Sequence, residues 1–408
     1  MLGVPLHQLL GQPHASEFLR GLVSRGRYAN AYLFDGPSGV GKMTAALSFA
    51  RAILCRSTEP ETARSPAAGA LGLFGDALPA AAATPKPHDD ACGVCGSCLK
   101  AGKLIHPDLK FLFPVTGEEK ALDDTIGDIL DDVRTDPFHV FRYEKADSIR
   151  LSQTRELLRE MAFKPFESSR RVVVVRDADR MRGDQASAML KSLEEPGAST
   201  IWVLTTSRPT RLPVTIRSRC QRVRFGPLPE SLIGQVLERA AGVSAPAARA
   251  LGALSSGSLG RALELRDADL PKVQAQAFDL LGIAMRGDPS ALWIAAQKFM
   301  NYGKTGRETL RRMADFHLMW LRDVLRVRTG APSECLVFPE REQDLRREAG
   351  ALDPTEIRRR MMVLEEMVRA IEGNVSADAA IFSTMARAAG HRLGEGEWPR
   401  HSTARWNY

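Results

Sequence analysis

The chain has 408 residues, a formal net charge of +7 and a hydrophobic fraction of 44%. This length fits two or three domains, and the hydrophobic fraction is sufficient for ordinary buried cores. No apolar stretch approaches the length of a membrane span, and the first residues, MLGVPLHQLLGQPHASEF, lack the pattern of a secretory signal. We therefore expect a cytoplasmic protein whose six cysteines are reduced thiols or metal ligands rather than disulfides. The basic charge is compatible with contact to nucleic acid but is weak evidence for it.

The N-terminal region predicts helices and a strand around a glycine-rich loop. Tyr32–Phe34 is a short buried-strand candidate, and apolar residues at helical spacing predict a helix over Thr44–Leu54. Residues 56–91 are rich in alanine and proline, which predicts a flexible insertion that buries little side-chain area. The apolar residues Leu71–Phe74 within this insertion could dock locally.

The central region predicts further elements of a parallel sheet. The strand candidates are Leu109–Phe113, Arg171–Arg176 and Ile201–Thr206. The continuous β-branched run Val172–Val175 is typical of a strand that is buried on both faces, as in α/β proteins. The helix candidates are Ser152–Ala162, capped by Ser152, and Gln185–Glu195, which ends at Pro196.

The pattern becomes helical after Phe225, and Gly226–Pro229 is a hinge candidate. We predict an α/β nucleotide-binding domain with a parallel sheet over residues 1–225 and a small helical domain over residues 226–270. A larger helical domain over residues 271–393 and a polar tail over residues 394–408 complete the predicted organisation.

Clustered carboxylates in residues 116–148 raise the question of a catalytic or metal site. The acidic residues that lie close together are Asp123, Asp124, Asp128, Asp131 and Asp132. No histidine lies within the run Asp123–Asp132 and the carboxylates have no fixed helical spacing, so a solvated loop is the favoured interpretation. A catalytic or metal site is the alternative.

The glycine-rich loop lies in the stretch DGPSGVGKMTAA, Asp35–Ala46. Gly36, Gly39 and Gly41 let backbone N–H groups turn inward around a phosphate, and Lys42 adds a cation at the start of a helix. The spacing G-x-x-x-x-G-K is that of a P-loop, and a chance glycine-rich turn is the alternative. The next position, which carries the magnesium-binding Ser or Thr of P-loop enzymes, is Met43.

The acidic residues after the Val172–Val175 run form the second half of such a site. Asp177 is placed to serve a metal, but the following position, where a water-activating Glu is expected, is Ala178. Asp179 could substitute for that Glu only if the end of the strand were rebuilt. Two departures at the reaction centre predict inefficient hydrolysis.

The cysteines Cys92, Cys95 and Cys98 form a C-x2-C-x2-C run, which predicts a structural Zn²⁺ site. A fourth ligand is needed, and Cys55, His88 and His106 are the candidates. Cys55 is favoured because the insertion could loop out and leave it beside the run. Three unmetallated thiols are the alternative interpretation. The two remaining cysteines, Cys220 and Cys335, are expected to be buried small apolar residues.

Together these segments resemble the AAA+ clamp-loader subunits of bacterial DNA polymerase III, the family that includes gamma/tau and delta-prime. The similar stretches are RYANAYLFDGPSGVGK, AMLKSLEEPG and TTSRPTRLPVTIRSRC, together with the cysteine run that follows the first helix after the P-loop. The resemblance covers residues 5–265. It implies an AAA+ P-loop domain with a zinc module formed by Cys55, Cys92, Cys95 and Cys98, then a helical lid and an all-α collar.

The resemblance also implies roles for single residues. Arg219, in the motif Ser218-Arg219-Cys220, corresponds to the arginine finger that reaches the ATP site of a neighbouring subunit. Thr205 or Thr206 corresponds to a polar sensor, and both remain candidates. Active members carry a sensor arginine at the position of Gly260. Departures at the chain's own nucleotide site beside a retained finger favour the delta-prime type.

We therefore predict a clamp-loader subunit that performs no independent catalysis and helps to load the sliding clamp onto primed DNA. Its expected partners are the gamma/tau and delta subunits, the clamp and, through the complex, DNA. The expected cofactor is structural Zn²⁺, and Gly36, Gly39, Gly41, Lys42 and Asp177 would form a degenerate site that binds ATP or ADP without turnover or only maintains the fold. The rival hypotheses are an active gamma-type ATPase and a zinc-containing DNA-binding module with a vestigial P-loop.

Overall fold

The computed structural model describes residues 4–56, 88–115, 122–135, 148–181, 183–194, 199–266, 270–297, 303–372 and 376–389. Apart from residues 56 and 88–91, the predicted insertion lies outside the described residues, as does the predicted polar tail. The chain divides into two compact units, Met1–Ile233 with Gly257–Leu263, and Gly234–Ser256 with Glu264–Tyr408. The predicted three-domain division remains a prediction.

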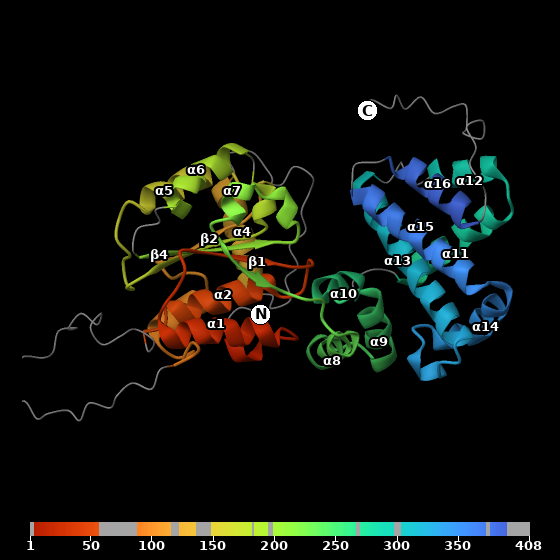
Figure 1. Cartoon of the computed structure of the whole chain (residues 1–408), viewed down its shortest axis with the longest axis horizontal. Helices are drawn as coiled ribbons and strands as arrows, with labels where there is room; N and C mark the ends of the chain where they lie inside the picture. Colours follow the sequence, from red (N-terminus) through yellow and green to blue (C-terminus); the bar gives the residue numbers. More distant parts are fainter. Residues whose placement is uncertain are drawn as a thin grey trace, which may run out of the picture. The chain divides into compact units, whose positions relative to one another are not determined.

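Unit 1 is built around a five-stranded parallel sheet in the order β2-β3-β4-β1-β5 (Figure 1). Its strands are β1 (Ala31–Asp35), β2 (Leu109–Leu112), β3 (Arg171–Val175), β4 (Thr200–Thr206) and β5 (Gln221–Arg224). Its helical elements are η1 (Leu6–Gln8), α1 (Pro13–Arg25), α2 (Lys42–Ile53), α3 (Gly96–Gly102), α4 (Leu122–Thr135), α5 (Leu151–Glu160), η5 (Ala178–Arg180), α6 (Gly183–Glu194), η6 (Pro209–Arg211) and α7 (Val214–Arg217).

Helices cover both faces of this sheet, which explains why its three central strands are buried along their whole length. In Figure 1, α1 and α2 lie on one side of the sheet and α5, α6 and α7 on the other. Alternation along each strand divides the core between the two faces. Tyr32 contacts Phe49 of α2 on the first side, with ring centroids 5.3 Å apart. Leu33 and Trp202 belong to the core on the second side.

The four predicted strands are confirmed to within a residue or two, and so is the predicted fold class, an α/β P-loop domain with a parallel sheet followed by helices. β5 was not predicted, because only Val223 of its four residues is buried. Parallel pairing places the carboxyl ends of β1, β3 and β4 at one edge, with β4 between the other two. The phosphate loop, Asp177 and the two threonines therefore meet there.

Two sequence predictions are wrong in detail. Residues 122–135 form the helix α4 rather than a loop. Leu122 belongs to a small hydrophobic cluster with Phe113 and Val115. Ile126, Ile129 and Leu130, which follow at helical spacing, pack against this cluster. The second error concerns the cap of α5, because this helix begins at Leu151 rather than at Ser152. The backbone N–H of Arg150 donates to Oε1 of Gln153 at 3.0 Å, so the N-terminus of the helix is capped without Ser152.

Unit 2 contains only helices among the residues that the structure describes. Two further helices have residues in both units, α8 (Glu230–Ala241) and α10 (Leu259–Arg266). The other helical elements are α9 (Ala245–Leu254), α11 (Leu270–Met285), α12 (Pro289–Gln297), α13 (Gly303–Arg328), η8 (Ser333–Cys335), η9 (Pro339–Arg341), α14 (Glu342–Ala351), α15 (Pro354–Glu372) and α16 (Ala377–Ala388). In the described part of the chain, none of the helices combines the length and the apolar character that crossing a membrane requires.

Packing in unit 2 centres on α13, which contacts α11, α14, α15 and α16. Phe278 and Trp320 meet edge to face with ring centroids 5.0 Å apart, and Phe316 joins them. The fully buried carboxylate of Asp323 accepts the backbone N–H groups of Val337 and Phe338 at 2.7 and 3.0 Å. This arrangement ties the segment after η8 to α13.

His317 on α13 makes the stability of unit 2 depend on pH. Burial lowers its pKa from the ordinary 6.5 to about 4, because the buried site disfavours the charged imidazolium. The neutral form is therefore favoured on folding, so stability is complete above pH 6.5 and falls as the pH drops from 6.5 toward 4. The loss amounts to roughly 3 kcal/mol.

We expect His317→Gln to remove this part of the pH dependence of the free energy of unfolding, measured by denaturant titration between pH 7.5 and 4.5. The exposed His14 provides the matched control, since His14→Gln should leave the wild-type slope unchanged. Equal slopes for wild type and His317→Gln would contradict the assignment.

Candidate functional site

The phosphate loop connects β1 to α2 and has the backbone that the glycines permit. Gly39 and Gly41 adopt left-handed φ angles of 72° and 95°, which L side chains rarely adopt. A Cβ atom on Gly39 would lie 2.1 Å from Oγ of Ser258. The loop therefore has the conformation expected of a P-loop and closely approaches the segment that precedes α10.

Lys42 begins α2, and its ammonium group folds back onto the loop. Nζ donates to the carbonyl oxygens of Gly36 at 2.8 Å and Pro37 at 2.5 Å. The side chain is buried, and this burial lowers the pKa of the ammonium group to about 8 although Asp177 opposes the change. To hold a phosphate, the lysine must exchange these carbonyl partners for phosphate oxygens.

The position at which active relatives are expected to carry a sensor arginine contacts the phosphate loop directly. The backbone N–H of Gly260 donates to the carbonyl of Gly39 at 3.2 Å. A Cβ atom at residue 260 would lie 3.2 Å from Cα of Gly39. Any side chain at position 260 therefore requires the phosphate loop or the start of α10 to move slightly. An arginine at position 260 would not fit the present backbone, although Arg261 is its neighbour in the sequence.

The two acidic residues after β3 have different partners. Asp177 has a left-handed φ of 45°, and its backbone N–H donates to Oγ1 of Thr205 at 3.1 Å. Its carboxylate accepts from Nε of Arg176 at 3.2 Å. Ala178, at the position expected for the water-activating acid, is fully buried. This end of the strand therefore presents one partly exposed carboxylate, that of Asp177.

Asp179 is withdrawn from the site by its own contacts. Its side chain is only 1% exposed, and Oδ1 accepts from the hydroxyl of Thr206 at 2.6 Å. Nε of Arg208 donates to Oδ2 at 3.1 Å. A carboxylate held in this way is a poor base for a water molecule, because both of its oxygens already accept hydrogen bonds and a guanidinium neutralises it.

The contacts assign Thr205 and Thr206 different structural tasks. Thr205 holds the backbone at Asp177, whereas Thr206 holds the Asp179 carboxylate and accepts the backbone N–H of Arg208 at 3.0 Å. The role of Arg208 was missed by the sequence analysis. Its position two residues beyond the end of β4, beside an acidic strand end, was the available signal.

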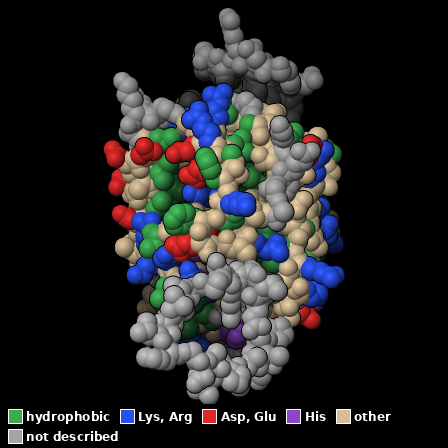
Figure 2. Space-filling model, turned by 90° about the vertical axis from the view of Figure 1, so that its left-hand side faces the viewer, with side chains coloured by type: hydrophobic (Ala, Val, Ile, Leu, Met, Phe, Trp, Pro, Cys, Tyr) green, Lys and Arg blue, Asp and Glu red, His purple; other side chains and the backbone are tan. Residues whose placement is uncertain are grey.

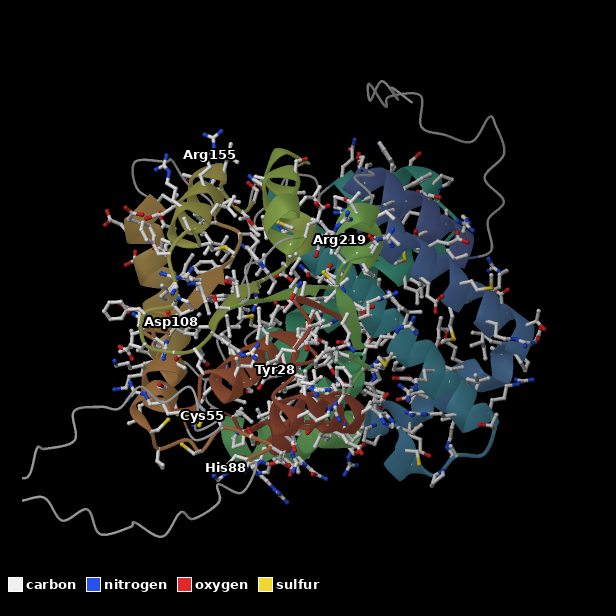
Figure 3. All side chains as sticks on the ribbon, turned by 60° about the vertical axis from the view of Figure 1, so that its left-hand side comes forward. Tyr28, Cys55, His88, Asp108, Arg155 and Arg219 are labelled. Atoms are coloured by element: carbon white, nitrogen blue, oxygen red, sulfur yellow. The ribbon has the colours of Figure 1, made fainter. Side chains whose placement is uncertain are left out.

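Arg219 lies between α7 and β5, away from the chain's own phosphate loop in sequence and labelled in Figure 3. Its Nη2 forms an ion pair with Oε1 of Glu194 at 2.6 Å, and Nη1 donates to the carbonyl of Thr215 at 2.8 Å. The side chain is 36% exposed. Two of its five N–H groups are thus engaged, and the rest find no partner among the residues that are described.

The four predicted cysteine ligands come together beside the carboxyl end of α2. The sulfur atoms of Cys55, Cys92, Cys95 and Cys98 lie within 4.8 Å of one another and could hold a metal ion. Backbone N–H groups of Cys92, Cys95 and Cys98 point at neighbouring sulfurs at 3.4 Å, an arrangement that favours thiolates. Figure 3 labels Cys55 at this place.

The other two candidates for the fourth ligand, His88 and His106, do not belong to the cysteine cluster. His106 is buried, and its Nδ1 accepts the backbone N–H of Asp108 at 3.1 Å. Burial lowers the pKa of His106. Of the remaining cysteines, Cys220 is buried as expected, whereas Cys335 is exposed, so its predicted burial is wrong.

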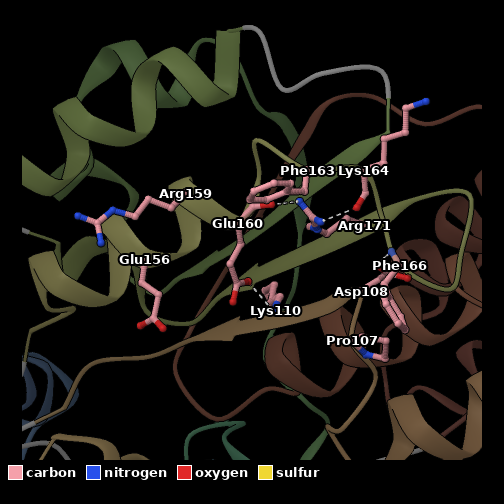
Figure 4. Close-up of a pocket in the computed structure, with 10 residues that line it drawn as sticks. All are labelled: Pro107, Asp108, Lys110, Glu156, Arg159, Glu160, Phe163, Lys164, Phe166 and Arg171. Carbon is pink, nitrogen blue, oxygen red and sulfur yellow. Dashed lines mark hydrogen bonds and ion pairs between the residues drawn. The ribbon is translucent and has the colours of Figure 1, made fainter.

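A cavity of about 390 Å³ lies between β2, α5 and the loop before β3 (Figure 4). Several of its charged groups are engaged by an ion pair or by the backbone. Lys110 pairs with Glu160 at 2.5 Å, and Arg171 donates to the backbone carbonyls of Glu160 and Lys164 at 3.1 and 3.2 Å. The carboxylate of Asp108 accepts three backbone N–H groups of the loop. These contacts order the loop that leads into β3.

Exposed hydrophobic side chains occur within or shortly after the cysteine run, at Val94, Leu99 and Ile105, and in the loop before β3, at Phe163 and Phe166. Figure 2 shows one face of the molecule on which hydrophobic side chains reach the surface between acidic and basic ones. Such mixed surface is common on subunits of assemblies, but scattered hydrophobic residues are also normal on monomers.

Comparison with known proteins decides between the fold classes that share a P-loop. The family model described as DNA polymerase III, delta subunit matches residues 11–69 and 75–229, more than half of the chain. The chain belongs to this family. It is a delta-prime-like clamp-loader subunit, as the sequence predicted, and its curated relatives also include tau and gamma subunits.

Two relatives share the delta-prime name. The DNA polymerase III subunit delta' of Bacillus subtilis is 26% identical over 368 residues, which cover 90% of this chain and 92% of the relative. The subunit delta' of Pseudomonas aeruginosa is 30% identical over 199 residues, which cover 49% of this chain and 44% of that protein.

More distant similarities extend to other subunits. The subunit tau of Bacillus subtilis is 25% identical over 217 residues, 53% of this chain and 28% of tau. A solved gamma subunit-related protein from Thermotoga maritima aligns with 92% of this chain and 98% of its own at 14% identity, with a TM-score of 0.41.

Proposed function

We propose that this subunit does not hydrolyse ATP itself and supplies Arg219 as an arginine finger to the ATP site of a neighbouring gamma-type subunit. The observation that carries the proposal is the contrast between two groups. Asp179, the nearest substitute for the missing water-activating acid, is buried and paired with Arg208. Arg219, in contrast, is partly exposed and retains N–H donors for a phosphate.

Three further features support the proposal that the chain's own nucleotide site does not hydrolyse ATP. Met43 offers no hydroxyl for magnesium. The ammonium group of Lys42 is bound by the carbonyls of its own loop. Gly260 replaces the expected sensor arginine and packs on Gly39. The loop glycines Gly36, Gly39 and Gly41, with Lys42 and Asp177, would then bind ATP or ADP without turnover or serve the fold alone.

We propose Zn²⁺ as the metal of the cysteine cluster, in a structural role. Tetrahedral zinc with Zn–S bonds of about 2.3 Å places its sulfur ligands roughly 3.8 Å apart. Cys55 and Cys95 have their sulfurs 4.0 Å apart, and Cys92 and Cys98 have theirs 3.9 Å apart. Four thiolates complete the tetrahedron, so such a site stabilises the module and leaves no position for a substrate.

In this proposal the subunit takes one end of a ring of clamp-loader subunits and partners gamma/tau and delta. The assembled complex opens the sliding clamp and places it on primed DNA. Arg219 would stabilise the charge that develops on the transferred phosphoryl group of ATP bound to the neighbour.

The purified chain tests the first half of the proposal. We expect its ATP hydrolysis with Mg²⁺ to equal the buffer background, because Met43 offers no hydroxyl for magnesium and the Asp179 carboxylate is already bound by Thr206 and Arg208. Lys42→Ala should leave this background unchanged. The same preparation must support DNA-stimulated hydrolysis when it is mixed with its partner subunits, which shows that it is folded. Turnover by the chain alone that disappears in Lys42→Ala would instead identify a gamma-type ATPase.

A further inference from the structure

Glu194 is the last residue of α6 and forms an ion pair with Arg219. A carboxylate at the carboxyl end of a helix is unfavourable by itself, because the helix dipole is negative there. The pair with the Arg219 guanidinium offsets this repulsion. α6 and α7 pack against each other, and Arg219 follows α7 by two residues, so the core sets the approximate position of both partners.

Two contacts define the orientation of the Arg219 guanidinium. Glu194 binds one terminal nitrogen, Nη2, and the carbonyl of Thr215 binds the other, Nη1. A guanidinium is planar, so contacts at both terminal nitrogens restrict how the group can rotate. Within the described part of the chain, each of these nitrogens keeps a second N–H and Nε keeps its own, so donors remain for an anion. Free arginine side chains lose considerable rotamer entropy when they are ordered, and this arrangement orders the side chain in advance.

We propose that Glu194 is a positioning residue for Arg219, which holds the guanidinium oriented for the phosphate groups of a nucleotide bound to the neighbouring subunit. The proposal rests on the proposed function of Arg219 as a finger in trans. Glu194 acts through the arginine and does not touch the nucleotide. Because both side chains are partly exposed, the pair is screened by salt and orients the arginine without immobilising it.

The test uses the complete clamp loader reconstituted with variants of this chain. We expect Glu194→Ala to lower kcat for DNA-stimulated ATP hydrolysis about tenfold and to leave KM for ATP unchanged, because orientation matters most in the transition state. Glu194→Gln keeps an oxygen acceptor for Nη2 and should retain most of the activity. Glu156→Ala, at an exposed glutamate on α5, is the matched control and should behave as wild type. The thermal midpoint of each variant is recorded to verify folding.

The decisive measurement is Glu194→Ala in an Arg219→Ala background. If Glu194 acts only through Arg219, the double variant has the kcat of Arg219→Ala alone. A further loss in the double variant would assign Glu194 an independent or merely structural role and overturn the inference. Wild-type kcat in Glu194→Ala, with a clear loss in Arg219→Ala, would overturn the inference and leave the proposed function intact. A kcat above wild type in Glu194→Ala would mean that the ion pair restrains Arg219, and would also overturn the inference. Wild-type kcat in Arg219→Ala would overturn both.

Discussion

Arg219→Ala is expected to reduce DNA-stimulated ATP hydrolysis by the reconstituted clamp loader by about 10³-fold, the lower end of the range for arginine fingers. The guanidinium would meet charge that develops on the phosphoryl oxygens in the transition state, so the loss falls on kcat rather than on KM. Arg219→Lys should lose most of the activity as well, because an ammonium group lacks the planar fork that binds two oxygens together. Steady-state ATPase measurements with primed DNA and the clamp provide the readout.

Two controls separate this effect from a general loss of charge or of assembly. Arg211→Ala removes another exposed arginine of the segment between β4 and α7 and should retain near-wild-type turnover. Gel filtration should show that the Arg219→Ala complex assembles completely. Undiminished ATP hydrolysis in an assembled Arg219→Ala complex would eliminate the role in trans, whatever the state of the chain's own phosphate loop.

The fold could be predicted from sequence where burial leaves a local pattern. The run Val172–Val175 lies on a strand that is covered on both faces, so no polar position interrupts it. The helix α4 was not predicted because its five aspartates give the segment the composition of a solvated loop. The helical signal lies in the spacing of its apolar residues, Leu122, Ile126, Ile129 and Leu130. β5 escaped for a different reason. As an edge strand it buries only Val223, so its sequence has no strand-like pattern. Its strand conformation is held by hydrogen bonding to β1.

The candidate site divides in a similar way. The phosphate loop is a local motif, so its glycines and Lys42 could be named from spacing alone. The pairing of Asp179 with Thr206 and Arg208 depends on β3 and β4 lying side by side, which is information about the sheet rather than about any one segment. The pairing of Glu194 with Arg219 likewise depends on the packing of α6 against α7. Neither pair has a signal within a single stretch of sequence.

Cys98→Ser is expected to abolish stoichiometric zinc binding and to lower the thermal midpoint of unfolding. The other three sulfurs cannot complete a tetrahedron around zinc. Structural zinc binds isolated peptides with about 10–16 kcal/mol, and even a loss of about 3 kcal/mol would lower the midpoint by roughly 6–12 °C for a domain of this size. Zinc content by elemental analysis and thermal unfolding followed by circular dichroism are the two measurements.

The exposed Cys335 provides the matched control, since Cys335→Ser removes a thiol outside the cluster and should retain both the metal and the wild-type midpoint. Serine at the buried position 98 can destabilise the chain for reasons unrelated to metal, so a chelator separates the two effects. A strong chelator should lower the midpoint of wild type and of Cys335→Ser toward that of Cys98→Ser, and should leave Cys98→Ser itself unchanged. A wild-type midpoint that is insensitive to the chelator, or full zinc content in Cys98→Ser, would refute the structural zinc site, because removal of an ion bound by all four cysteines should destabilise the fold around them.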